Sequence, residues 1–391
     1  MMNYNFDEII DRKGTDAVKL ERCKALFGTE DVLPLWVADM DFRTPDFILD
    51  TIRKRLDHPI LGYSVPPEGF NDAFVKWVRD HHRWPVSASQ VGFVPGIVPA
   101  LSFAVQCFSE PGDEVMIQPP VYYPFFNVIR NNNRVVVTNP LREAGGKFAM
   151  DFDDLESKIT EKTRLFILCN PHNPGGKVWT PETLRRLDEI CTRRNILVVS
   201  DEVHADMVLN GYRHTPYATV SDTAAKGSVT FMAPTKVFNM PGIVSSSYII
   251  PDGALRARFA HFLEAAEMNT GNLFAYLTTV ACYEQGEEWR VAMLEYVQGN
   301  IRYVIDYLAG HLPQIRPMEP EASFLLWLDC SALGMDTDTL HRFFALKAGL
   351  GLNKGTVFGE GGEYHLRLNV ACPRAVLVRA MQQLSAAVAE L

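Results

Sequence analysis

A chain of 391 residues with 47% hydrophobic and 22% charged residues has the composition of a globular protein, and it is long enough for more than one domain. This composition excludes a disordered or collagen-like chain, and a formal net charge of −9 argues against nucleic acid or an anionic membrane as the main partner. The seven cysteines are odd in number and form no CxxC pair, which argues against a disulfide framework or a zinc site and favours reduced thiols in a cytoplasm.

The N-terminal sequence MMNYNFDEIIDRKGTD has acids and bases where a secretory signal needs an apolar core. No stretch approaches the roughly 20 uncharged apolar residues of a membrane span. We therefore expect a soluble, cytoplasmic protein. The stretch 1–45 shows no alternation of strands and helices, so we expect it to pack as an arm or as part of a smaller domain.

The segment 46–284 repeats one pattern: a short apolar run, a turn rich in Gly, Pro or Asn, and then an amphipathic stretch. This alternation predicts a large α/β domain, and several runs are apolar almost throughout, as strands covered on both faces should be. Thr180 is expected to cap the helix that begins at Pro181. The predicted strands are 90–94, 114–117, 134–138, 165–169, 197–200, 228–232 and 246–250, and the predicted helices are 99–107, 181–194 and 254–265.

After about residue 285 the chain changes to long amphipathic segments, at 288–312 and 337–347. Between and after them lie two strand-like pieces, at 324–328 and 365–369. This texture predicts a second, smaller α+β domain over 285–391.

Three segments carry unusual polar residues directly after an apolar strand, where ligands bind in open α/β sheets. They are NPHNPGG at 170–176, SDEVHAD at 200–206 and APTKVFNMPG at 233–242. Lys236 follows the run VTFM by four residues, and a lysine at a sheet edge can be withdrawn from water, so that its neutral amine attacks a carbonyl. Taken alone, such a lysine is more often a solvated surface charge.

Asp201 ends the run ILVVS and is expected at the carboxyl edge of the sheet. There it could cap the next helix or pair with a protonated heterocyclic nitrogen. Asn173 lies in a doubled Asn-Pro turn, and most Asn-Pro pairs are simply turns. Together, and in this order, the three segments supply an amine for a Schiff base, an acid for a pyridine nitrogen and an amide for a phenolic oxygen.

With these residues the chain resembles fold-type I pyridoxal-phosphate enzymes of the aspartate aminotransferase superfamily, and within it the branch of carbon-sulfur lyases similar to cystathionine beta-lyase. The similarity runs from about residue 30 to 375. It implies a PLP-dependent transferase-like fold with a mostly parallel sheet sandwiched by helices, pyridoxal 5'-phosphate as the cofactor and a small amino acid as the substrate. The branch is indicated by LPLWVADMDF at 33–42, GYSVPPEGF at 62–70, SDEVHAD, TKVFNMPG, GEEW at 286–289 and RLNVACP at 367–373.

Carried over to the matching positions, the resemblance makes Lys236 the Schiff-base lysine and catalytic proton carrier, and Asp201 the partner of the pyridine nitrogen. Asn173 would donate a hydrogen bond to the phenolic oxygen. Tyr122 would stack on the ring, although an aromatic residue in such a run is more often part of the core. Arg367 would clamp the substrate's carboxylate, a bidentate task suited to a guanidinium group.

The resemblance also assigns the cofactor's phosphate. It would bind the backbone amides of Ile97 and Val98, after Gly96, where the start of a helix favours an anion. Tyr63 matches a tyrosine that reaches across a dimer interface to the neighbouring subunit's phosphate. A homodimer is therefore expected.

Two positions depart from many members of the superfamily: Ala233 and Val244 stand where a serine and an arginine are common. Thr235, Ser245 and the tyrosine from the neighbouring subunit are therefore expected to contribute more to phosphate binding. We interpret Val244 as a marker of the lyase branch. His204, which replaces a tyrosine that many aminotransferases have near the phenolic oxygen, also fits that branch. The other histidines show no metal-ligand spacing, so no metal is expected.

Lys236, Asp201 and Arg367 serve two reactions equally. In β-elimination the carbanion at the α carbon expels a thiolate, and the products are a thiol, pyruvate and ammonia; in transamination the proton moves instead to the cofactor's aldehyde carbon. We favour β-elimination on the branch resemblance, with a class I/II aminotransferase as the alternative. A PLP-binding regulator without turnover is disfavoured, because such proteins usually carry a DNA-binding domain ahead of this fold and this chain is acidic.

Overall fold

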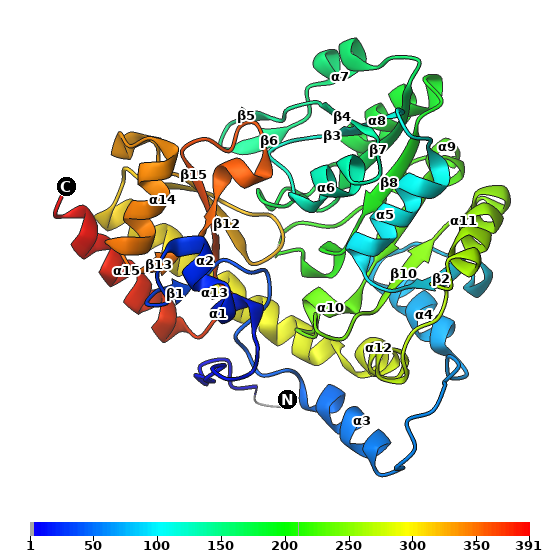
Figure 1. The fold of residues 1–391 in the computed structure, drawn as a ribbon, viewed down its shortest axis with the longest axis horizontal. Coiled ribbons are helices and arrows are strands. Elements are labelled where there is room, and N and C mark those ends of the chain that lie inside the picture. The colour runs from blue at the N-terminus through cyan, green and yellow to red at the C-terminus, as the bar shows by residue number, and fades with distance from the viewer. Residues whose placement is uncertain (1–3, 210) are drawn as a thin grey trace.

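A seven-stranded sheet forms the centre of the larger part of the molecule (Figure 1). The computed structural model describes residues 4–209 and 211–391 of the chain. In order across the sheet the strands are β2 (Val91–Val94), β10 (Ser246–Ile249), β9 (Ser228–Met232), β8 (Leu197–Asp201), β7 (Thr163–Cys169), β3 (Glu114–Ile117) and β4 (Val135–Thr138). The prediction of a mostly parallel sheet is confirmed: β10 pairs antiparallel with both of its neighbours, and the other pairs are parallel. Each predicted strand lies within two residues of its expected bounds.

Helices cover both faces of this sheet, because its central strands are apolar on both sides. Along β7, Leu165 and Ile167 join one apolar core, whereas the alternate residues Phe166 and Leu168 join another. The first core is closed by α5 (Ile97–Phe108), α6 (Pro124–Arg130) and α11 (Gly253–Ala265), and the second by α7 (Phe152–Lys158), α8 (Pro181–Arg193) and α9 (Asp222–Lys226). The expected layer of helices on each face is therefore confirmed.

The C-terminal part of the chain, yellow to red in Figure 1, forms a four-stranded antiparallel sheet with three helices. Across the sheet the strands are β11 (Arg316–Met318), β12 (Leu325–Asp329), β15 (His365–Asn369) and β14 (Asn353–Lys354), and the helices are α13 (Glu287–His311), α14 (Thr337–Leu346) and α15 (Arg374–Val388). These elements agree with those predicted after residue 285. The domain limits stay a prediction, because one apolar core that includes Phe74, Val304 and Leu377 joins helices on both sides of residue 285.

The N-terminal stretch adds one short strand to the C-terminal part. β1 (Leu33–Pro34) pairs in parallel with β13 (Leu350–Gly351), and Phe27 shares a small apolar cluster with Ala345 of α14. The remaining helices and strands are α1 (Val18–Glu21), α2 (Cys23–Phe27), α3 (Asp46–Leu56), α4 (Phe70–His82), α10 (Pro234–Val237), α12 (Leu273–Gln285), β5 (Arg142–Ala144) and β6 (Lys147–Ala149). Over the described ranges, none of the helices has both the length and the apolar character needed to cross a membrane.

The three polar segments predicted from the sequence meet at one edge of the large sheet. They follow β7, β8 and β9, which are adjacent and parallel, so their carboxyl ends lie side by side. The third segment turns at once into the short helix α10, which carries Lys236. This edge is where ligands bind in open α/β sheets.

Candidate active site

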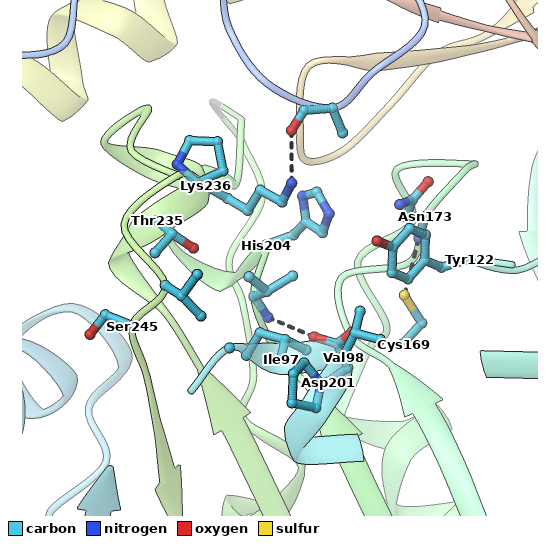
Figure 2. A pocket seen from close by; sticks show the side chains of 16 residues that line it. Ile97, Val98, Tyr122, Cys169, Asn173, Asp201, His204, Thr235, Lys236 and Ser245 are labelled. Atoms are coloured by element: carbon cyan, nitrogen blue, oxygen red, sulfur yellow. Dashed lines mark hydrogen bonds between the residues drawn. The ribbon is translucent and has the colours of Figure 1, made fainter. Parts of the chain in front are cut away.

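A cavity of about 840 Å³, counted with its open mouth, lies at the carboxyl ends of β7 and β8 and beside α10 (Figure 2). Its lining includes every predicted cofactor-site residue except Tyr63. The lining residues are Ala38, Gly96, Ile97, Val98, Pro99, Tyr122, Cys169, Asn173, Asp201, Val203, His204, Thr235, Lys236, Pro241, Val244 and Ser245. The segments that the sequence analysis singled out thus contribute to a single cavity.

Lys236 extends from α10 toward the chain that follows β1, as Figure 2 shows. Its Nζ atom donates a hydrogen bond of 2.8 Å to the carbonyl oxygen of Ala38. Withdrawal of the amine from water lowers the pKa of Lys236 to about 8. A substantial fraction of the amine is therefore neutral near physiological pH, which is the state that attacks a carbonyl or accepts a proton.

Asp201 is the last residue of β8 and is only 3% exposed. Its Oδ1 atom accepts a hydrogen bond of 3.2 Å from the backbone amide of Val203, in a turn rather than at the start of a helix. Burial raises the pKa of Asp201 to about 7, and the neighbouring carboxylate of Glu202 adds to the increase. A buried carboxylate with so few partners is suited to a cationic group that enters the cavity.

Asn173 and Tyr122 form the side of the cavity across from Lys236 in Figure 2. The backbone amide of Asn173 donates to the Sγ atom of Cys169 at 3.3 Å, and its side-chain Oδ1 accepts a hydrogen bond of 3.1 Å from Arg367. The sequence analysis missed Cys169, although its place as the last residue of β7 is the same kind of signal that identified Asp201. Burial raises the pKa of the Tyr122 hydroxyl, which therefore stays protonated.

Arg367, on β15, is a buried cation next to this cavity with only 3% of its surface exposed. Besides Asn173, its guanidinium group donates to the carbonyl oxygen of Trp36 at 2.8 Å and to Oδ1 of Asn353 at 2.6 Å, and it lies 4.9 Å from the centre of the Phe358 ring. Burial lowers its pKa to about 10, and its Nε atom donates no hydrogen bond to any residue that the structure describes. Since each of these acceptors is neutral, the positive charge is left available for an anion.

The start of α5 forms the floor of the cavity. Gly96, its N-cap, has φ of +93°, and a Cβ atom there would lie 3.1 Å from a methyl group of Val244. The first amides of a helix have no acceptors within the helix, and those of Ile97 and Val98 belong to residues that line the cavity. This end of the cavity therefore has a backbone that favours an anion.

Three further predicted residues complete the lining. Thr235 and Ser245 contribute hydroxyl groups, and the Oγ atom of Ser245 forms a hydrogen bond of 2.8 Å with Oγ1 of Thr279. His204 is 4% exposed, and its Nδ1 atom forms no hydrogen bond within the described part of the chain. Burial and nearby cations lower the pKa of His204 to about 3, so the ring is neutral in the physiological range.

Tyr63 is the predicted residue that the fold does not bring to the cavity of its own chain. It lies between α3 and α4 with its side chain fully exposed. The neighbouring apolar residues Ile60, Leu61 and Val65 are also largely exposed. Such a run in solvent is unusual for a monomer and typical of a contact with another chain.

Comparison with known proteins agrees with this architecture. The family model for aminotransferase class I and II matches residues 30–384. Cystathionine beta-lyase PatB of Bacillus subtilis is 43% identical over 384 residues, which cover 98% of this chain and 99% of PatB. Cystalysin from Treponema denticola, whose crystal structure contains pyridoxal 5'-phosphate, superposes with a TM-score of 0.96 at 32% identity and covers 100% of both chains.

A third similar protein is the PLP-bound C-S lyase from Staphylococcus hominis, with a TM-score of 0.92 and 35% identity over 99% of this chain and 98% of that one. The sequence match and the structural matches extend over almost the whole chain, and they agree with the cavity at the carboxyl edge of the sheet. The protein therefore belongs to the aminotransferase class I and II family.

Proposed function

We propose that this protein is a PLP-dependent carbon-sulfur β-lyase, which cleaves a sulfur amino acid into a thiol and 2-aminoacrylate; one water molecule then hydrolyses the aminoacrylate to pyruvate and ammonia. The observation that carries the proposal is that Lys236 and Asp201 line one cavity, beside the uncompensated cation of Arg367. The similarity to the cystathionine beta-lyase PatB and to the C-S lyase from Staphylococcus hominis favours the lyase reaction among those that such a site supports.

The residues of the cavity fit pyridoxal phosphate. The buried carboxylate of Asp201 has capacity for a protonated ring nitrogen, and the amides of Ile97 and Val98 with the hydroxyl of Thr235 have capacity for a phosphate. The bound cofactor supplies an electron-accepting ring to the substrate's α carbon. Tyr122 would pack on that ring and Asn173 would donate to its phenolic oxygen, and neutral His204 would add no charge near that oxygen.

Arg367 binds and orients the substrate through its α-carboxylate. Because its present partners are neutral oxygens, a carboxylate replaces weak acceptors with a charged one, and the exchange gains a charge-assisted pair. The ring of Phe358 holds the guanidinium plane in place by a cation–π contact. This anchor holds the substrate's α-carboxylate at the side of the cavity next to Asn173.

Lys236 moves the proton. Its neutral amine removes the proton from the substrate's α carbon and becomes an ammonium ion. The same ammonium ion then donates that proton to the sulfur that leaves the β carbon as a thiol, so that the amine is neutral again. Asp201 keeps the ring nitrogen protonated throughout, because a buried carboxylate favours a positive partner.

The reaction type is tested by supplying cystathionine without any keto acid. A β-lyase is expected to form pyruvate and a free thiol at equal rates under these conditions, because elimination needs no second substrate. Lactate dehydrogenase with NADH measures the pyruvate, and a thiol reagent measures the other product. Turnover that requires a keto acid would instead support the class I/II aminotransferase, and binding of PLP without turnover of either kind would support a regulator.

We further propose a homodimer in which Tyr63 reaches the partner's cavity. The exposed apolar run around Tyr63 supports a contact with a second copy of the chain. Coexpression of Tyr63→Ala and Lys236→Ala subunits is expected to restore activity, because each mixed dimer then contains one complete site. Random assortment gives about a quarter of the wild-type sites in a symmetric dimer. Activity no higher than the sum of the two separate variants would contradict this arrangement.

A further inference from the structure

A second, wider cavity also reaches Lys236. It has a volume of about 1610 Å³, counted with its open mouth, and its walls come from the N-terminal stretch, the segment 37–44, α3 and the turn after α10. Charged groups of the N-terminal stretch and of the segment 37–44, among them Arg12, Asp39 and Asp41, line it together with Lys236. The amine of Lys236 therefore lies at the border of two cavities, and Asp39 belongs to the second.

The carboxylate of Asp39 is held in a cluster of two cations and two anions. Arg12 forms ion pairs with Asp39 at 2.7 Å and with Asp41 at 2.8 Å. Lys19, whose side chain is 1% exposed, lies 2.8 Å from Asp41 but 3.4 Å from Oδ1 of Asp39. That Oδ1 atom is buried and accepts no hydrogen bond from residues 4–209 or 211–391, so Asp39 is the less fully compensated of the two carboxylates.

The backbone on both sides of Asp39 is fixed to the turn that carries Lys236. On one side, Nζ of Lys236 donates to the carbonyl oxygen of Ala38. On the other side, Oδ1 of Asn239 accepts from the amide of Met40 at 3.0 Å, and its Nδ2 donates to the carbonyl oxygen of Met40 at 3.2 Å. The backbone on either side of Asp39 is therefore bonded to the turn that carries the amine.

Of the charges around the amine, Asp39 has the largest effect. Asp39 and Asp201 raise the pKa of Lys236, Arg367 lowers it, and the effect of Asp39 exceeds those of the other two. His204 and Tyr122 line the same cavity as Lys236, and both are neutral: His204 is unprotonated and the Tyr122 hydroxyl keeps its proton. Withdrawal from water has the largest effect on the pKa of Lys236 and lowers it, and the Asp39 carboxylate is the charge that most opposes this decrease.

We propose that Asp39 is a positioning residue of the site: its carboxylate, fixed by Arg12 and Lys19, stabilises the ammonium form of Lys236. The proposal rests on the proposed function to the extent that Lys236 is the proton carrier. After the amine takes the proton from the α carbon, it is a cation close to the cation of Arg367. A fixed carboxylate on its other cavity stabilises that state without touching the substrate.

The test measures protonation of Lys236 directly in the full-length protein without cofactor. Fluorodinitrobenzene reacts only with the neutral amine, and mass spectrometry of the peptide that contains Lys236 gives the labelling rate at each pH. We expect a midpoint near pH 8 for the wild type. In Asp39→Asn the midpoint should fall by roughly 0.5 to 1 pH unit, because an opposing charge is lost.

The matched control is Asp41→Asn. Asp41 shares Arg12 and Lys19 with Asp39 but is three residues from Ala38, whose carbonyl oxygen the amine contacts, so its loss should shift the midpoint clearly less. Asp39→Glu keeps the negative charge, so its midpoint should lie close to that of the wild type. An unchanged midpoint in Asp39→Asn, or an equal shift in Asp41→Asn, would overturn the proposal.

The removal of Asp39 also leaves buried Lys19 with one fewer anion, which could impair folding. The double variant Lys19→Met/Asp39→Asn keeps the cluster neutral, and its midpoint should still be lowered because Asp39, unlike Lys19, lines the cavity that Lys236 borders. The labelling needs neither substrate nor cofactor. If the midpoint falls as expected in Asp39→Asn but the wild-type protein forms no pyruvate from cystathionine, the lyase function is rejected and the proposed effect of Asp39 on Lys236 still holds.

Discussion

Lys236→Ala is expected to lower the rate of pyruvate formation by at least about a thousandfold, because the variant loses both the amine that binds the cofactor and the group that moves the proton. The loss should be chemical rather than structural, since the side chain lines a cavity and its one hydrogen bond goes to a backbone carbonyl. Steady-state assay with cystathionine measures the rate. Borohydride reduction followed by peptide mass analysis should place the cofactor on the Lys236 peptide in the wild type and nowhere in the variant.

Lys226→Ala is the matched control for this experiment. Lys226 is exposed at the end of α9, on the same part of the chain, and does not line the cavity. Its removal should leave both the rate and the borohydride label unchanged. Retention of the label in Lys236→Ala, or a rate within tenfold of the wild type in a variant that unfolds at the normal temperature, would mean that another amine does this work.

The sheet and its active edge could be predicted because the signals are local. Strands buried on both faces are apolar throughout, and Thr180 does cap α8 as predicted, through a hydrogen bond of 3.2 Å from the amide of Thr183. Asp201 could be located because a polar residue that ends an apolar strand must emerge at the edge of the sheet. Cys169 has the same place at the end of β7, but a cysteine does not interrupt an apolar run, so only its position could have indicated it.

The parts of the site that could not be predicted depend on contacts between distant segments. Ala38 and Lys236 are 198 positions apart, and the carbonyl oxygen of Trp36 meets Arg367 across 331. The strand that brings these residues in, β1, has two residues, too few for a periodic pattern. Composition and periodicity describe one segment and its own faces. They therefore cannot predict that residues 36–38 contact Lys236 and Arg367 at the edge of the large sheet.

Asp201→Asn is expected to lower the rate of pyruvate formation by about 100- to 1000-fold, since the electrostatic partner of the reacting group is lost. In the cofactor-free protein the same change should increase stability. The pKa of Asp201 is about 7 in the folded protein, above its value in the unfolded chain, so the folded state holds an extra proton at intermediate pH. The wild type therefore loses stability as the pH rises from about 4 to 7, and this loss persists above pH 7.

The asparagine variant has no such dependence. Thermal unfolding of the two cofactor-free proteins should give similar melting temperatures near pH 4, and the variant should unfold at a higher temperature at pH 8. A variant that is less stable than the wild type at pH 8 would mean that Asp201 has compensating partners in the folded chain. The Asp201 carboxylate would then already be paired within the protein and would not be free to bind a cationic group of the cofactor.

Asp206→Asn is the contrasting control, because Asp206 is an equally buried carboxylate five residues further on that has partners of its own. It lies 2.8 Å from the ring of His82 and accepts a hydrogen bond of 2.8 Å from the indole of Trp77, and His82 is the main cause that lowers its pKa. Asp206 therefore adds stability above its unfolded pKa and loses it as the pH falls, so Asp206→Asn should unfold at a lower temperature than the wild type at pH 8. At pH 8 we therefore expect opposite changes in melting temperature: a decrease for Asp206→Asn and an increase for Asp201→Asn. This result would show that the Asp206 carboxylate stabilises the fold, whereas the Asp201 carboxylate destabilises the cofactor-free fold and serves a ligand.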